Sequence, residues 1–130
     1  MGTVTNTEDW VVVVVDDEYD NIFLLQKMLE HLKITVHTAR NGQEALDILD
    51  ELGTATFVLM DLSMPVMDGW KALEHIRKSP VYSDVPVIAV TAHAMRGDKQ
   101  RALDVGFDAY VTKPFRPSLI LSMIKDVIEV

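Results

Sequence analysis

The segment WVVVVVDDE, residues 10–18, is the most informative about the fold of this chain. Its apolar part, residues 10–15, is continuous and rich in β-branched side chains, which is typical of a strand buried on both faces of a parallel sheet. Three acidic residues follow directly, so this strand ends on a cluster of carboxylates. Four further apolar runs have strand length: ITVHTA at 34–39, FVLM at 57–60, VIAV at 87–90 and AYVT at 109–112.

The segments between these runs have the apolar spacing of amphipathic helices. The pattern predicts helices over residues 20–31, 45–52, 70–77 and 98–105, and a fifth that begins at Pro117 and runs through Val127. Strands and helices therefore alternate five times along the chain. This alternation predicts an α/β fold, a doubly wound five-stranded parallel sheet with helices on both faces and right-handed crossovers.

Length and composition indicate one globular domain. The chain has 130 residues, of which 48% are hydrophobic and 25% charged, a balance typical of soluble proteins. We interpret residues 1–9 as a flexible lead-in and residues 10–130 as the domain. The net charge of −8 argues against a nucleic-acid binder, and the absence of cysteine excludes disulfide and thiol chemistry. No apolar run is long enough to span a bilayer and no signal peptide is recognisable, so we expect a cytoplasmic location.

Polar residues follow four of the five predicted strands, at the edge of a parallel sheet where ligands bind. They are Asp16 and Asp17 after the first strand, Asp61 after the third, Thr91 after the fourth and Lys113 after the fifth. The second strand is followed by residues 40–42, which have the composition of an ordinary turn. Taken one at a time, each of these polar residues could have a purely structural role; Asp17, for example, could cap the helix that follows it. Together, three carboxylates repel one another unless a cation lies among them, and Mg²⁺ is suited to such oxygen ligands.

This set of side chains favours phosphoryl transfer. A carboxylate can attack phosphorus and form an acyl phosphate, and such a transfer depends mainly on positioning and charge neutralisation. The metal, the Lys113 ammonium and the Thr91 hydroxyl can each hold one phosphoryl oxygen. Asp61 is the candidate nucleophile because it lies in the middle of the set, after an apolar strand.

The polar positions lie within four motifs that resemble one known family. The motifs are VVVDDE at 13–18, LMDLSMPVMDG at 59–69, VIAVTAHAM at 87–95 and AYVTKPF at 109–115. In this order they resemble the receiver domain of response regulators, the phosphoryl-accepting domain of two-component and phosphorelay signalling. The likeness covers the chain from about residue 10 to the C-terminus, and it implies the flavodoxin-like (βα)5 fold.

The resemblance implies how the acceptor site is built. Asp61 is expected to be the phosphorylated aspartate, and the Mg²⁺ ligands are expected to be Asp17, Asp61 and the backbone carbonyl of Ser63, with Asp16 helping through water. Some members of the family have Asn where this chain has Ser63. Ser63 and His93 are expected to stand at the mouth by which water approaches the phosphoryl group, so we expect both to modulate dephosphorylation.

The resemblance also implies how the signal is received and passed on. Thr91 and Lys113 are expected to hold the phosphoryl group, Thr91 and Tyr110 to form the switch, and the Lys113–Pro114 peptide bond to be cis. The expected phosphodonor is a histidine kinase or a histidine phosphotransfer protein, and the expected target is another protein, without direct nucleic-acid binding or membrane insertion. Residues 91–115 look most like stand-alone receivers and those of hybrid kinases. We expect no enzymatic activity beyond the domain's own phosphorylation and dephosphorylation.

Three other functions were weighed against this one. An aspartate-nucleophile phosphatase uses a second aspartate as general acid two positions after the nucleophile, where this chain has Ser63. A flavodoxin-like cofactor binder needs a Ser/Thr/Gly-rich loop after the first strand, where this chain has three acidic residues. An interaction module with an inactive site is disfavoured by the complete set of Asp17, Asp61, Thr91 and Lys113.

Overall fold

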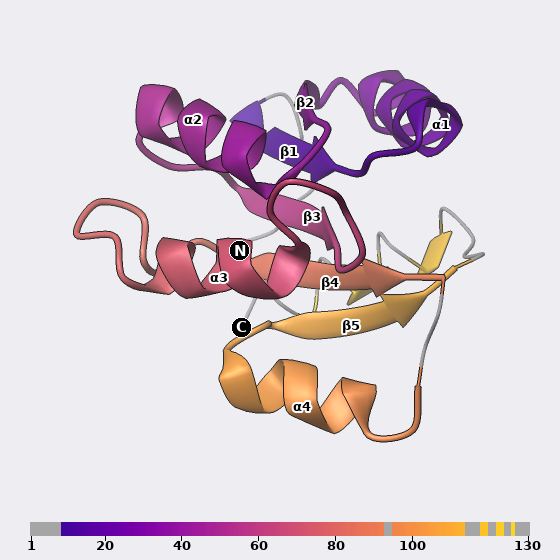
Figure 1. Cartoon of the computed structure of the whole chain (residues 1–130). Coiled ribbons are helices and arrows are strands. Elements are labelled where there is room, and N and C mark those ends of the chain that lie inside the picture. The colour runs from indigo at the N-terminus through magenta and orange to yellow at the C-terminus, as the bar shows by residue number, and fades with distance from the viewer. Residues whose placement is uncertain (1–8, 93–94, 114–117, 120–121, 124–125, 127–130) are drawn as a thin grey trace.

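The computed structural model describes residues 9–92, 95–113, 118–119, 122–123 and 126. Five parallel strands form one sheet in the order β2-β1-β3-β4-β5 (Figure 1). Their bounds are β1 Val11–Val15, β2 Thr35–Ala39, β3 Phe57–Asp61, β4 Val87–Thr91 and β5 Ala109–Thr112. The chain passes from β1 to β2 on one side and then to β3 on the other, so a switch point lies between β1 and β3. The predicted fold class is confirmed.

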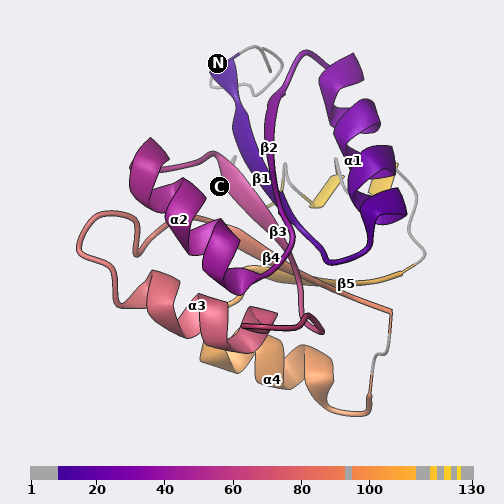
Figure 2. The same ribbon diagram turned by 45° about the horizontal axis from the view of Figure 1, so that its top comes forward.

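Four helices are described on the two faces of this sheet (Figure 2). They are α1 Tyr19–His31, α2 Gly42–Leu52, α3 Gly69–Arg77 and α4 Asp98–Val105. Strand β1 shows how the faces divide: Val12 and Val14 pack into the core layer that contains α1 residues, whereas Val13 and Val15 pack into the layer with residues of α2, α3 and α4. The fifth helix, expected from Pro117, lies largely outside the described residues and stays a prediction. None of the helices in the described ranges is long and apolar enough to cross a membrane.

Local hydrogen bonds explain where two helices begin. The Asn41 side chain accepts from the backbone N–H of Glu44, and the Asp68 side chain accepts from that of Lys71. Each cap satisfies a donor that the helix itself leaves unpaired. Helix α2 therefore starts three residues before the position expected from its apolar spacing. That spacing marks only the residues on the buried face and does not detect the cap.

The strands differ from expectation at their ends. Trp10 precedes β1 and packs edge-on against Phe57 at 6.1 Å between ring centroids. Asp61 and Thr91 are the last residues of β3 and β4, where their backbone is still held in the sheet. Both side chains are buried, so the site begins inside the sheet edge and not in the loops beyond it.

Candidate functional site

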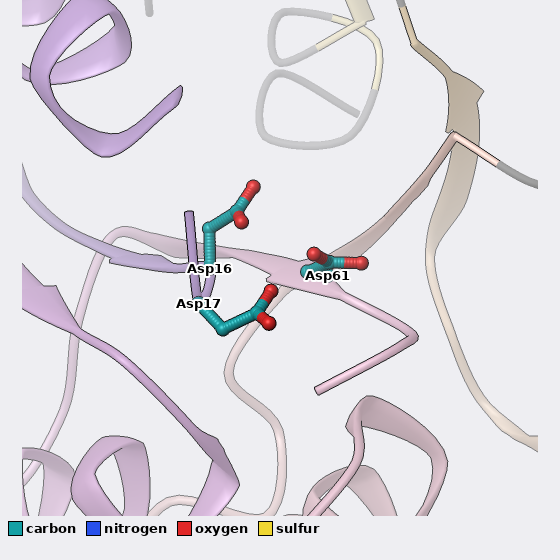
Figure 3. A group of neighbouring side chains, drawn as sticks. All are labelled: Asp16, Asp17 and Asp61. Atoms are coloured by element: carbon teal, nitrogen blue, oxygen red, sulfur yellow. The ribbon is translucent and has the colours of Figure 1, made fainter. Parts of the chain in front are cut away.

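Three carboxylates meet where β1 and β3 end (Figure 3). Asp16 and Asp17 follow β1, Asp61 ends β3, and one oxygen of each residue lies within 4.8 Å of the others. Asp16 is 2% exposed and Asp61 5% exposed. Carboxylates buried this deeply require nearby donors or cations, because water no longer stabilises their charge.

Backbone donors supply part of that stabilisation. The N–H of Glu18 donates to Asp16 Oδ1 at 2.9 Å, and the N–H of Ser63 donates to Asp61 Oδ1 at 3.1 Å. In addition, the Asp16 N–H donates to the carbonyl of Ala39 at the end of β2 at 3.0 Å. The loops after β1 and β3 are therefore fixed by the same carboxylates that they present.

Lys113 supplies the cation. Its Nζ lies 2.6 Å from Asp16 Oδ2 and 3.4 Å from Asp61 Oδ2, and 13% of the side chain is exposed. Strand β5 is two positions from β3 in the sheet, about 10 Å at the usual strand spacing. A long side chain is needed to cross β4 and reach the carboxylates, and lysine provides it.

A small pocket of about 190 Å³ opens beside these groups. It is lined by Asp17, Glu18, Asp61, Ser63, Ala92 and Lys113. Asp16 lies behind this lining in the Lys113 ion pair. Thr91 is buried at the end of β4, the strand next to β3. The volume suits a small polar group, such as a phosphoryl group, better than a drug-sized ligand.

The surroundings shift the pKa values of both Asp61 and Lys113. Burial raises the pKa of Asp61 from 3.8 to about 6, helped by the neighbouring Asp16 charge and opposed by the Ser63 N–H and by Lys113. Burial lowers the pKa of Lys113, but its hydrogen bond and ion pairs with Asp16 and Asp61 outweigh this, so the net shift is upward. Lys113 is therefore charged at neutral pH, and the ionised Asp61 carboxylate is held at a cost that a bound cation would relieve.

We predict that Asp61 makes the metal-free protein less stable as pH rises from 3.8 to about 6. In this range the folded state keeps the Asp61 proton while the unfolded chain has released it, so the free energy of unfolding falls with rising pH. Urea denaturation of the wild type and of Asp61→Asn in EDTA checks this. The variant should gain stability relative to the wild type across the range, and a constant difference would contradict the shifted pKa.

The geometry also fits a hard divalent cation. The cluster of Asp16, Asp17 and Asp61 offers only oxygen ligands, which Mg²⁺ prefers, and the open side of the pocket leaves room for the waters that Mg²⁺ retains. The backbone N–H of Ser63 already points to Asp61, which places the Ser63 backbone at the same site.

The remaining predicted site residues lie in different settings. Tyr110 pairs with Ala89 in the sheet, and its hydroxyl is buried without a hydrogen-bond partner in the part of the chain that the structure describes. His93 and Pro114 lie outside the described residues, so their expected roles stay predictions.

One neighbour of the site was missed by the sequence reasoning. Arg40, expected in an ordinary turn after β2, extends a guanidinium N–H to the Asp17 carbonyl at 3.5 Å. The signal available in the sequence was its position directly after a strand, at the same sheet edge as the acidic residues. It was passed over because turns are commonly polar.

Comparisons with known proteins point to one family. A family profile described as "Response regulator receiver domain" matches residues 12–125. The chain is 37% identical over 119 residues to hybrid signal transduction histidine kinase I of Dictyostelium discoideum; the match covers 87% of this chain but 7% of that protein. It is 38% identical over 114 residues to an uncharacterised 14.6 kDa protein of Leptolyngbya boryana, with 88% and 86% of the two chains covered.

A solved structure has the same fold. The receiver domain of sensor histidine kinase PA1611 from Pseudomonas aeruginosa PAO1, which was crystallised with magnesium coordinated in its active-site cleft, matches with a TM-score of 0.84 and 29% identity. The match covers 93% of this chain and 98% of that one. The resemblance predicted from the four motifs is therefore confirmed, and this chain belongs to the response regulator receiver domain family.

Proposed function

We propose that residues 10–130 form a phosphoryl-accepting signalling domain in which Asp61 is the acceptor. One observation carries the proposal: the Lys113 ammonium contacts both Asp16 and Asp61, an oxygen of Asp17 lies within 4.8 Å of oxygens of both acids, and Asp61 lines a pocket of phosphoryl size. Family membership supports a phosphoryl-accepting role. Asp61 is the carboxylate that both contacts the Lys113 ammonium and lines the pocket.

The reaction uses Asp61 as a nucleophile. An Asp61 oxygen forms a bond to the phosphorus of the donor, the bond from phosphorus to the leaving group breaks, and the leaving group keeps the electron pair. Lys113 holds one phosphoryl oxygen by charge and hydrogen bonding, and Thr91, at the end of the neighbouring strand, holds another. Mg²⁺ bound by Asp17, Asp61 and the Ser63 carbonyl, with Asp16 nearby, would neutralise the charge that builds up on the transferring group.

Relatives suggest the source of the phosphoryl group. The matched protein of Dictyostelium is a hybrid histidine kinase, so we propose a phosphohistidine of a histidine kinase or phosphotransfer protein as the donor. A downstream protein then receives the signal by contact, in the cytoplasm, and the domain turns over no substrate other than its own aspartyl phosphate.

Phosphorylation by a small donor tests the acceptor. Acetyl phosphate with Mg²⁺ should add one phosphoryl group, detected by intact mass, and Asp61→Asn should abolish it. Glu51→Gln is the control, since it also removes one carboxylate, but an exposed one on α2 that does not line the pocket. Labelling that survives in Asp61→Asn would refute the assignment.

Mg²⁺ is expected to stabilise the fold by relieving repulsion within the acidic cluster. A ligand that binds only the native state adds about 2.7 kcal/mol at a hundredfold excess over its Kd. Thermal unfolding with EDTA and with saturating MgCl₂ measures this gain. Asp17→Asn should lose most of it and Glu51→Gln should keep it; an equal gain in both variants would place the ion elsewhere.

The buried Tyr110 hydroxyl supports a switch at β4 and β5. A hydroxyl buried without a partner destabilises this conformation, so another arrangement of Tyr110 lies within reach when Thr91 moves toward a phosphoryl group. We therefore propose Thr91 and Tyr110 as the switch pair. Chemical shifts of β4 and β5 should move on adding beryllofluoride, and a response confined to the pocket would argue against this pair.

Replacing Tyr110 with phenylalanine is expected to stabilise the unphosphorylated protein by about 1 kcal/mol, because it removes a buried hydroxyl that has no hydrogen-bond partner among the described residues. Tyr82→Phe is the matched control with the opposite sign: its hydroxyl donates to Asp50 at 2.6 Å, and losing that bond should cost about 1 kcal/mol. Urea denaturation compares the two variants. A loss of stability in Tyr110→Phe would show that its hydroxyl is paired in solution.

The lifetime of the phosphoryl group stays a prediction. The Ser63 side chain is exposed at the pocket, which supports water access to the phosphoryl group. Comparing the dephosphorylation rates of Ser63→Asn, His93→Ala and the wild type tests whether these positions control the lifetime. Rates within about twofold of the wild type, a difference of about 0.4 kcal/mol in the barrier, would exclude such control.

A further inference from the structure

Helices α3 and α4 are neighbours (Figure 2). Residues of both helices line a second groove, larger than the acidic pocket and away from it. Its volume is about 510 Å³, within the range of pockets that hold ligands or peptide side chains. Four cationic side chains and two carboxylates line it, and one of the four cations, Arg77, is already paired with Asp108; the chain as a whole has a net charge of −8. The groove is therefore a positively charged region on an acidic protein.

The cations of this groove are only partly neutralised. Lys71 Nζ and Lys78 Nζ lie 3.3 and 3.7 Å from the same carboxylate oxygen of Glu74, so one acidic residue serves two ammonium groups. Arg101, on the α4 side, has no carboxylate partner within the described ranges and lies over the Trp70 ring at 4.0 Å. A ligand with two or more negative charges would find partners on both sides of the groove.

Apolar surface separates these cations. The Trp70 ring packs edge-on against Phe107 at 5.7 Å. Leu73 is buried behind the groove, and Val105 on α4 is 50% exposed. An apolar strip between charged edges is the pattern that binds an amphipathic segment, because burial provides affinity and charge sets the orientation.

We infer that the α3–α4 groove binds an acidic amphipathic helix of a partner protein. Lys71 lies in α3 and Lys78 is its C-cap residue, seven positions later, so their backbones are about 10.5 Å apart along the helix axis, whereas both ammonium groups converge on Glu74. Both side chains are more than half exposed, so they can turn from Glu74 toward two carboxylates that lie two turns apart on a partner helix. An apolar side chain between those carboxylates then contacts Val105 and Trp70, and a third carboxylate reaches Arg101 across the groove.

Charge favours a peptide over a nucleic acid as the occupant. A phosphate backbone would meet the four cations but would also be repelled by the remaining acidic surface. A short acidic helix places its charge only in the groove. This site uses none of the residues proposed for phosphoryl transfer, so its failure and that of the proposed function are separate results.

NMR titration of the ¹⁵N-labelled chain tests the inference directly. The probe is a synthetic helical peptide with glutamates two turns apart and leucines between them, compared with the same peptide carrying lysines in place of the glutamates. The indole N–H of Trp70 should shift with the acidic peptide and not with the basic one. Trp10, the other of the two tryptophans, is buried against Phe57 and serves as an internal reference.

Charge-reversal variants locate the site. Lys71→Glu and Arg101→Glu should each weaken binding about tenfold, and added salt should weaken it further because the charges are exposed. Lys27→Glu, on α1, makes the same change in net charge outside the groove and should leave the Kd unchanged. Lys71→Glu keeps the Trp70–Arg101 contact, so it remains informative if Arg101→Glu disturbs α4.

Four results would overturn the inference. They are equal binding of the basic peptide, shifts centred on α1 or on Trp10, absence of shifts at millimolar acidic peptide, and tighter binding of a single-stranded oligonucleotide than of the acidic peptide. Binding that the Lys27→Glu control weakens as strongly as Lys71→Glu would also count against it, since it would reflect net charge alone.

Discussion

Replacing Gly69 with alanine is expected to destabilise the fold by about 3 kcal/mol, the upper part of the range for overpacking. A Cβ at this position would collide with the backbone oxygen of Asp61 and would lie 3.0 Å from Leu62 Cα. Both neighbours are backbone atoms of the chain that leaves β3, so neither can turn away as a flexible side chain would. Relief requires that α3 and the end of β3 move apart.

The same displacement would reach the proposed acceptor. Moving a reacting group by about 1 Å can cost about a hundredfold in rate, so we expect phosphorylation of Asp61 by acetyl phosphate to slow by about that factor in Gly69→Ala. In that case the position of α3 and the reactivity of the pocket would be coupled through this close contact. Urea denaturation and the initial rate of labelling measure the two effects separately.

Gly53→Ala is the control for this variant. Gly53 ends α2 with a φ of +80°, and an added Cβ would meet no atom within 4 Å. Alanine there is strained by its backbone conformation alone, at a cost of about 1 kcal/mol, and should not change the labelling rate. If Gly69→Ala matched Gly53→Ala in both stability and labelling rate, the close approach of Gly69 to Asp61 would not affect phosphorylation.

Replacing Arg77 with methionine is expected to destabilise the protein by about 4 kcal/mol, since each carbonyl that loses its donor in a poorly hydrated site costs about 1–3 kcal/mol. The guanidinium donates to the carbonyls of Ser83, Val85 and Gly106 and to the carboxylate of Asp108, at 2.7–3.1 Å. It therefore ties the end of α3 to the loop before β4 and to the turn between α4 and β5. Methionine keeps the length of the side chain but donates nothing.

Two further variants separate the causes of this loss. Lys78→Met removes a charge at the next position, where 75% of the side chain is exposed and Glu74 lies 3.7 Å away, and should change stability by less than about 0.5 kcal/mol. Arg77→Lys keeps the charge but not the fork of donors, so it should lose much of the stability that Arg77→Met loses. Recovery to the wild-type value in Arg77→Lys would mean that charge, and not donor geometry, matters.

Much of the site was predictable because it follows from strand order. In a parallel sheet the residue after each strand lies at one edge, so Asp16, Asp61 and Lys113 could be placed together before any distance was known. The type of each side chain then indicated the chemistry. What could not be predicted was the pairing: Lys113 lies nearer to Asp16 than to Asp61, because side-chain direction depends on packing across three strands.

Other features depend on contacts that no local pattern encodes. Arg77 belonged to the apolar spacing of its helix and gave no sign of the carbonyls that it binds. Trp70 had no assigned role until Arg101 was found over its ring. Arg40 was assigned to an ordinary turn, although it reaches the Asp17 carbonyl. Most of these partners, such as Gly106 for Arg77, are distant in sequence, and distance in sequence removes the periodicity on which prediction relies.

The alternation of buried strands and amphipathic helices, the family, and the identity of the acidic residues at the sheet edge could be predicted from the sequence, because these depend on local composition and on the fixed geometry of parallel sheets. Three features became visible only in the folded chain: the close approach of Gly69 to the backbone of Asp61, the Tyr110 hydroxyl that is buried without a partner in the described residues, and the cationic groove lined by α3 and α4. These features arise where elements that are far apart in the chain pack together, and their distances are set by the volume and direction of side chains from both elements.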